Sequence, residues 1–335
     1  MKGSRGLWLI VPWALFGLIA LGWVGYWNFV ASTAENRINS WVAAQNNAGA
    51  QASYLRIVRH GFPVLLRLEI QSISYGPARG GWRATTPRAD VNIEMLQPEH
   101  IIFQAAAPIA VTRSDGAVTN VVADRMIASL RTQNGQLAVA GVEADNLTLD
   151  DPAQQGVLSV QKFVANARPD PRAAGQYQLA MQADQLTLPR PVRSFEAFGV
   201  DVQHLQAAIV IEHGAALLRT DPNDPLGPWR EAGGKLRFEG LALRWGPLET
   251  TGSGEGTLDA QRRLQGRLVI PVQHPAPVLT AISNGDNVNH SAQQALRLLA
   301  ASYVVSGNQI TLDVNADNGV LRVEGLSVRT LPPVY

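Results

Sequence analysis

Apolar and polar residues alternate with two different periods along the chain. Residues 7–30 form a run of 24 residues without a charge, which as a helix is about 36 Å long against a hydrocarbon core of about 30 Å. Residues 31–50 keep a helical pattern, with Ile38, Trp41 and Val42 on one side. This pattern predicts a transmembrane anchor that continues into a connecting helix, whose apolar side packs on the following domain.

Charges on either side of the anchor predict its orientation. Lys2 and Arg5 precede the span, whereas Glu35 and Arg37 cancel each other just after it. The positive-inside rule therefore places the N-terminus in the cytoplasm and the bulk of the chain outside it. A cleaved signal peptide is the alternative, because residues 32–34 (Ser-Thr-Ala) have the small-x-small form of a cleavage site, but the apolar run exceeds the roughly 7–15 residues of a secretory signal.

After the helical segment the period changes to two, which is typical of half-buried strands. Leu66, Leu68 and Ile70 alternate with charged or polar residues, and Leu268, Ile270 and Val272 repeat the pattern. A further alternating stretch covers residues 310–316. We therefore predict an α+β, strand-dominated fold with one N-terminal transmembrane helix followed by two curved antiparallel β lobes.

Helices and chain breaks organise these strands. Residues 123–131 and 291–302 carry a 3.6-residue period and are predicted to be helices packed on the sheet. Proline-rich turns favour a join between the lobes near residue 190, with 221–228 as the runner-up. The predicted parts are therefore the cytoplasmic tip and anchor, the connecting helix and two lobes: residues 1–30, 31–50, 51–190 and 191–335.

Two internal resemblances indicate a repeated strand unit. Residues 236–245 and 321–330 share six of ten positions. In both, the apolar residues occupy every second position, and this set of positions shifts by one residue (a change of apolar parity) after a glycine, Gly240 or Gly325. Such a one-residue shift is typical of a β-bulge, which keeps one face apolar while the strand bends. The second pair is Ala-Asp-Asn-Leu-Thr-Leu at residues 144–149 and Ala-Asp-Gln-Leu-Thr-Leu at residues 183–188.

Composition argues against several kinds of chemistry. The 335 residues carry a net charge of +1, whereas a protein that neutralises phosphates needs a basic surplus, so no nucleic-acid partner is expected. The absence of cysteine excludes disulfides, thiolate metal sites and cysteine nucleophiles. The six histidines form no metal-binding motif, and no catalytic motif occurs. We therefore expect no enzyme activity, no cofactor and no metal.

The spacing of oxygen-bearing side chains in residues 313–324 resembles that of a calcium-binding loop. Asp313, Asn315, Asp317 and Glu324 stand at positions 1, 3, 5 and 12 of such a loop. However, the sixth position lacks glycine, the apolar residues between the oxygens alternate as in a strand, and residues 318–319 are Asn-Gly, a strong hairpin signal. The segment is therefore predicted to be a strand–turn–strand.

The order of these features resembles a family. The N-terminal span, the stretch Arg-His-Gly-Phe-Pro at residues 59–63 before an alternating strand, and the late strands that contain Leu-x-Gly resemble the bacterial membrane-anchored family known as domain of unknown function 2125. More distantly, the strand repeats resemble AsmA-like envelope proteins. The resemblance implies a curved antiparallel sheet in the periplasm, anchored in the inner membrane through residues 7–30, with a concave apolar surface associated with lipid handling in the AsmA relatives.

Strands with one apolar side must cover it with helices, another sheet or a ligand. Because few helices are available, we expect a non-enzymatic periplasmic protein that binds or transfers lipid or other apolar envelope material. The alternative is a structural or interaction scaffold of the envelope, with closed β lobes and no ligand. The candidates for a lipid groove are the apolar residues of the clearest strands: Leu66, Leu68, Ile70, Leu268 and Ile270.

Overall fold

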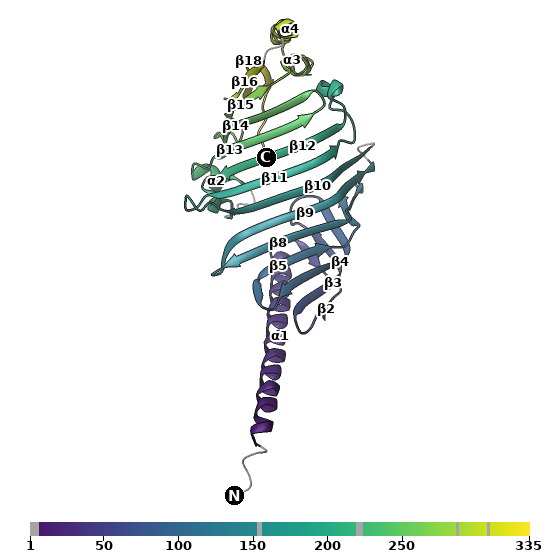
Figure 1. Ribbon diagram of the computed structural model, residues 1–335. Helices are drawn as coiled ribbons and strands as arrows, with labels where there is room; N and C mark the ends of the chain where they lie inside the picture. The colour runs from purple at the N-terminus through teal and green to yellow at the C-terminus, as the bar shows by residue number, and fades with distance from the viewer. Residues whose placement is uncertain (1–6, 153–155, 219–223, 286–287, 307–308) are drawn as a thin grey trace. The chain divides into compact units, whose positions relative to one another are not determined.

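The computed structural model describes residues 7–152, 156–218, 224–285, 288–306 and 309–335. These residues form two units: unit 1 extends to Val121 and includes Met126–Gly135, and unit 2 contains Val122–Arg125 and Gln136–Tyr335. Strands dominate both units, as predicted (Figure 1). The division lies well before the predicted join near residue 190, which falls inside unit 2 between two strands that pair with each other.

A single helix begins unit 1. Helix α1 spans Leu7–Asn47, about 60 Å, so the predicted anchor and connecting helix form one continuous element. It ends where Gly49 takes a φ of 87°, a left-handed conformation that glycine adopts without steric cost. Ile38 packs against the sheet of unit 1, and the ring of Trp41 lies 5.8 Å from that of Tyr75. The predicted docking of this side is therefore confirmed.

The sheet of unit 1 is antiparallel and has β3 and β4 at its centre. β3 pairs with β1, β2 and β4; β4 also pairs with β5 and β6; β5 pairs with β8 and β6 with β7. The strands are β1 (Gln51–Ser53), β2 (Arg56–His60), β3 (Leu65–Gly76), β4 (Trp82–Glu94), β5 (Gln97–Ala105), β6 (Ile109–Arg113), β7 (Val118–Val122) and β8 (Arg125–Gln133).

The prediction of a helix at residues 123–131 is wrong. Most of this segment lies in β8, where Leu130 pairs with Ile101 and Ala128 with Phe103. A nine-residue window fits either period, and strand pairing with β5 decides the outcome here.

Unit 2 is an antiparallel meander in which every strand pairs with the next (Figure 1). Its strands are β9 (Gln136–Asp151), β10 (Gly156–Pro169), β11 (Tyr177–Thr187), β12 (Asp201–Ile211), β13 (Leu236–Trp245), β14 (Leu248–Leu258), β15 (Leu264–Val272), β16 (Ile310–Asp317), β17 (Val320–Val323) and β18 (Leu326–Thr330). Its helices are η2 (Arg193–Phe198), η3 (Gly214–Leu218), α2 (Gly227–Glu231), α3 (Pro275–Ser283) and α4 (His290–Ser306).

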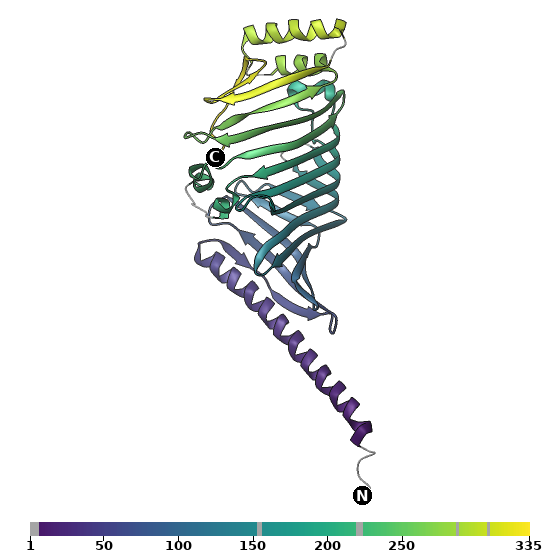
Figure 2. The same cartoon turned by 60° about the vertical axis from the view of Figure 1, so that its left-hand side comes forward.

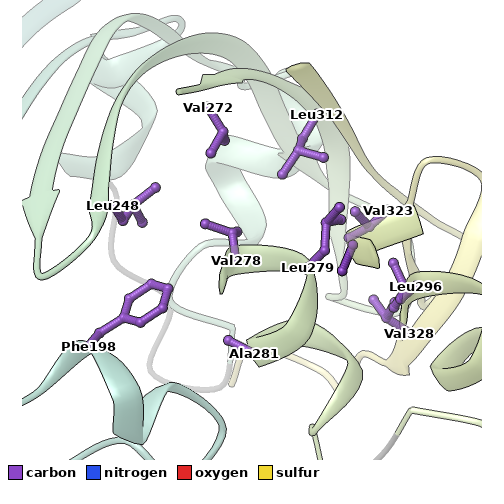
Figure 3. Close-up of a cluster of buried hydrophobic side chains, with 11 residues drawn as sticks. Phe198, Leu248, Val272, Val278, Leu279, Ala281, Leu296, Leu312, Val323 and Val328 are labelled. Atoms are coloured by element: carbon purple, nitrogen blue, oxygen red, sulfur yellow. The ribbon is translucent and has the colours of Figure 1, made fainter. Parts of the chain in front are cut away.

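Helices α3 and α4 lie beside the last strands of the meander (Figure 2). They enclose a buried cluster with these strands, to which Leu279 and Leu296 contribute from the helices and Val272 and Leu312 from the sheet (Figure 3). The helix predicted at residues 291–302 is therefore confirmed, and it packs on the sheet as expected.

The two glycines of the internal repeat have different structures. Phe238 and Leu241 are three positions apart on β13, whereas their partners Gly254 and Gly252 are two positions apart on β14. Gly240 therefore lies at a β-bulge, as predicted. Gly325 instead occupies the two-residue turn between β17 and β18, where Glu324 and Gly325 have φ values of 51° and 76°. The prediction of a bulge at Gly325 is wrong. A two-residue hairpin turn shifts the apolar positions by one residue just as a bulge does, so the sequence pattern did not distinguish the two.

Candidate apolar binding face

The strand register of unit 2 places apolar side chains on one side of β9–β13. Residues directly opposite each other in antiparallel strands share a side of the sheet. Three such rows run across these five strands, and we call them the apolar face: Ala140, Ala167, Leu179, Ile209 and Phe238; Val142, Ala165, Met181, Ala207 and Leu241; Ala144, Phe163, Ala183, Leu205 and Leu243. None of these positions carries a charge or a side-chain hydrogen-bonding group.

Irregular strand positions keep the apolar residues on this side. Asn146 in β9 and Gln185 in β11 have φ values of 50° and 51°, in the left-handed region. Each is skipped in the pairing with β10 together with Gln161, and the register shift appears where Val202 and His204 of β12 pair with the adjacent Trp245 and Arg244 of β13. Leu147 and Leu186 therefore stand in register with Trp245 on the apolar side. The repeated sequence at residues 144–149 and 183–188 therefore corresponds to one strand irregularity that occurs twice.

The other side of the same strands is charged. Asp145, Lys162, Asp184, His204 and Arg244 stand opposite one another in register. Nδ1 of His204 lies 2.6 Å from Oδ1 of Asp184, and this hydrogen bond lowers the pKa of the Asp184 carboxyl. Polar groups and charges are thus segregated to one side of the sheet.

Helices η2, α3 and α4 cover the apolar side of unit 2 toward the last strands. Near α3 and α4, Val272 and Leu312 are buried (Figure 3). In the middle of the apolar face Leu179, Met181 and Ile209 remain half-buried. Among the described residues, neither buried cluster includes any member of β9–β12. Ala144, Ala183 and Ala207 are nevertheless buried, and the other members of the rows in β9–β12 are partly exposed. The apolar face is therefore only partly covered across these strands.

The predicted groove residues fall into two environments. Leu66, Leu68 and Ile70 are buried between β3 and helix α1, in contact with the cluster around Trp27 and Ala31. They fill a closed core, because the connecting helix lies directly on them, and they do not line a groove.

Leu268 and Ile270 are half-buried in β15. Leu268 extends the first row of the apolar face, since it pairs with Gly254, the partner of Phe238. Ile270 packs against the cluster below α3 and α4. Sequence reasoning missed the residues of β9–β13, although the repeat at 144–149 and 183–188 was a signal of their common environment.

A hollow of about 440 Å³ lies at the bulge of β13. Ala208, Gly240 and Ser253 belong to its lining, in which Glu239 is the one charged side chain. In the part of the chain that the structure describes, no group of three or more His, Asp or Glu residues is placed to hold a metal ion. The apolar face is therefore the stronger candidate for a binding site.

The segment with calcium-loop spacing has a structural explanation. Asp317 pairs with Val320 across a turn in which Asn318 and Gly319 have φ values of 52° and 74°. The carboxylate of Glu324 accepts a hydrogen bond of 2.7 Å from the backbone N–H of Asp313. The predicted strand–turn–strand is confirmed.

Together these features define a strand-dominated protein with a partly exposed apolar sheet face and an N-terminal helix long and apolar enough to cross a membrane. The chain belongs to the bacterial family described as "Uncharacterized protein conserved in bacteria (DUF2125)", whose model matches residues 27–332. No curated protein and no solved structure matches the chain. The predicted family is confirmed, and the more distant resemblance to AsmA-like proteins stays a prediction.

Proposed function

We propose that this protein binds acyl chains of envelope lipids on the apolar face of unit 2, and that helix α1 anchors it in the inner membrane. The observation that carries the proposal is the continuous, uncharged apolar surface across β9–β13, in which every member of the three rows except Ala144, Ala183 and Ala207 is at least partly exposed. Exposed contiguous apolar surface of this kind marks an interaction site in a folded protein. No catalytic step is part of the proposal.

The dimensions of the apolar face suit an acyl chain. Neighbouring strands lie about 4.8 Å apart, so a row across five strands is about 19 Å long. One leaflet of the hydrocarbon core is about 15 Å thick, half of about 30 Å. An acyl chain needs only apolar contact along its length, and the three rows offer no polar group that would be left unsatisfied.

Residues after the anchor are proposed to lie in the periplasm. Lys2 and Arg5 before the apolar run favour a cytoplasmic N-terminus. A reporter enzyme that is active only in the cytoplasm, fused after Tyr335, should be silent. Activity of this reporter would overturn the orientation and leave the acyl-chain proposal to be judged by the following test.

Photoreactive lipid can separate binding at the apolar face from lipid around the anchor. The full chain in detergent is irradiated with a diazirine-labelled phospholipid, and adducts are mapped to peptides by mass spectrometry. We expect adducts in β10–β12 as well as in residues 7–30. Leu179→Glu should abolish the adducts in β10–β12, because a carboxylate on the apolar face repels the chain, and should leave those of the anchor.

Gln178→Glu is the matched control, since it adds the same charge one residue away on the opposite side. The Gln178 amide oxygen accepts a hydrogen bond of 2.9 Å from Arg168, which a carboxylate can also accept. The substitution removes the amide bond to Asp170, so the melting temperature of this variant is measured alongside its adducts. Its adducts should equal those of the unchanged protein. Adducts confined to residues 7–30 in the unchanged protein would overturn lipid binding and favour the scaffold alternative.

A further inference from the structure

Exposed apolar side chains lie on α1 and on two loops of unit 1 that contact it. Phe62 and Val64 lie in the loop between β2 and β3, and Leu96 lies in the turn between β4 and β5. Val64 is 70% and Leu96 81% exposed, and Phe62 and Phe29 of α1 are also exposed. We propose that these four residues, which we call the apolar collar, are immersed in the boundary of the lipid bilayer. The inference rests on the proposed anchoring by α1.

Hydrogen bonds hold both loops of the collar to one level of the helix. The indole N–H of Trp23 donates to the carbonyl of Pro63 at 2.9 Å, and the hydroxyl of Tyr26 donates to the carbonyl of Met95 at 3.2 Å. Met95 in turn donates its N–H to the carbonyl of Val64 at 3.4 Å. The ring of Trp27 meets that of Phe62 edge-on at 5.7 Å. The collar therefore has a fixed position along α1.

The length of α1 places the bilayer boundary at this level. The apolar run before Trp23 comprises residues 7–22, which as a helix span about 24 Å and fall short of a hydrocarbon core of about 30 Å. About 20 helical residues are needed, so the boundary reaches Tyr26. A tilted helix needs still more residues, and the collar would then lie deeper.

The chemistry of the collar fits this depth. Residues 61–66 and 95–98 carry no charge, and the first charged or titratable side chains beyond them are His60, Arg67, Glu94 and Glu99. Unpaired backbone carbonyls are costly near hydrocarbon, and here Trp23, Tyr26 and Trp27 donate to carbonyls of both loops. Tryptophan and tyrosine are also the residues enriched at the membrane interface.

Backbone geometry gives the β2–β3 loop its shape. Gly61 has a φ of 91°, and a Cβ atom there would lie 2.6 Å from the carbonyl oxygen of Leu65. Only glycine therefore allows the N–H of Leu65 to bond the carbonyl of Gly61 at 3.0 Å and close the loop that presents Phe62 and Val64.

Single-cysteine labelling tests the collar in the full chain, which has no cysteine of its own. Val64→Cys and Leu96→Cys are labelled with an environment-sensitive fluorophore and reconstituted into vesicles of phosphatidylcholine with brominated acyl chains. We expect blue-shifted emission and a loss of intensity relative to vesicles without bromine.

Two control positions make the result specific. Leu55→Cys is equally exposed at 70%, but the neighbouring Tyr54 bonds Asn39 of α1, about 20 Å further along the helix than Tyr26. Its label should stay unquenched. Phe16→Cys, on the apolar run itself, should be quenched if α1 spans the bilayer.

The outcomes separate the collar from the anchor. Quenching at Phe16 without quenching at Val64 and Leu96 overturns the collar and leaves the anchor in place. No quenching at Phe16 overturns the anchor, and the collar with it. Quenching at all positions, Leu55 included, also overturns the collar, because unit 1 would then adsorb on the membrane without a defined depth.

Discussion

Truncation of Leu296 tests how α4 covers the end of the sheet in unit 2. Leu296 is 0% exposed and lies in the cluster that joins α3, α4 and the last strands (Figure 3). Replacing such a leucine by alanine removes buried contacts and leaves a cavity, which costs about 2–5 kcal/mol. Because unit 2 has between 150 and 250 residues, each kcal/mol lowers the melting temperature by about 2–4 °C, so we expect a decrease of about 4–20 °C.

Leu298 provides the control on the same helix. It is 74% exposed, so Leu298→Ala should change the melting temperature by little, within the roughly 0.5 kcal/mol typical of surface substitutions. Calorimetry of the full chain in detergent micelles measures both variants. Equal shifts for Leu296→Ala and Leu298→Ala would refute the packing of α4 on the sheet, since only Leu296 of the two is buried by that packing.

Two further predictions concern unit 1 and the repeat. Arg59 binds the carboxylate of Glu35 through two bonds of 2.6 Å, and this contact lowers the pKa of Glu35 below 4.5. Glu35→Gln should therefore reduce the free energy of unfolding above pH 4.5 by about 0.2–1 kcal/mol. The difference between the two proteins should disappear as the pH falls through the lowered pKa of Glu35. A difference in stability that persists in acid would contradict the ion pair. Gly325→Ala should destabilise the protein by about 1–2 kcal/mol, because the φ of Gly325 is 76°. Gly240→Ala should be nearly neutral, since nothing lies within 4 Å of the position of an added Cβ atom. Urea unfolding measures both variants, and equal losses of stability would contradict the different backbone conformations of the two glycines.

The period of the sequence was sufficient to predict the strand-dominated fold class and the long apolar helix. It could not predict what the helix covers. Leu66, Leu68 and Ile70 have the same alternation as Leu268, yet the first three lie buried under α1 and Leu268 remains half-buried. A period-two pattern states that one side of a strand is apolar, and only the tertiary arrangement decides whether a helix or open surface meets that side.

The one-residue shifts in the apolar pattern could not by themselves distinguish a bulge from a turn. The shifts at Gly240 and Gly325 look alike in sequence because a bulge and a two-residue turn both add residues between apolar positions. Pairing with neighbouring strands distinguishes them: β13 continues past Gly240 beside β14, whereas the chain reverses at Gly325. The sequence Glu-Gly was a weaker turn signal than the Asn-Gly at residues 318–319.

The apolar face depends on the pairing register of strands that are far apart in sequence. Leu179 and Phe238 share a row only because β12 lies between them in register. A one-residue slip of β12 would move every one of its side chains to the other side and interrupt all three rows. The irregularities at Asn146, Gln185 and Gly240 change the parity within their strands, and the apolar residues beyond them stay on one side. The register therefore keeps fifteen apolar positions on one side of five strands, and most of them stay partly exposed, although Ala144, Ala183 and Ala207 are buried.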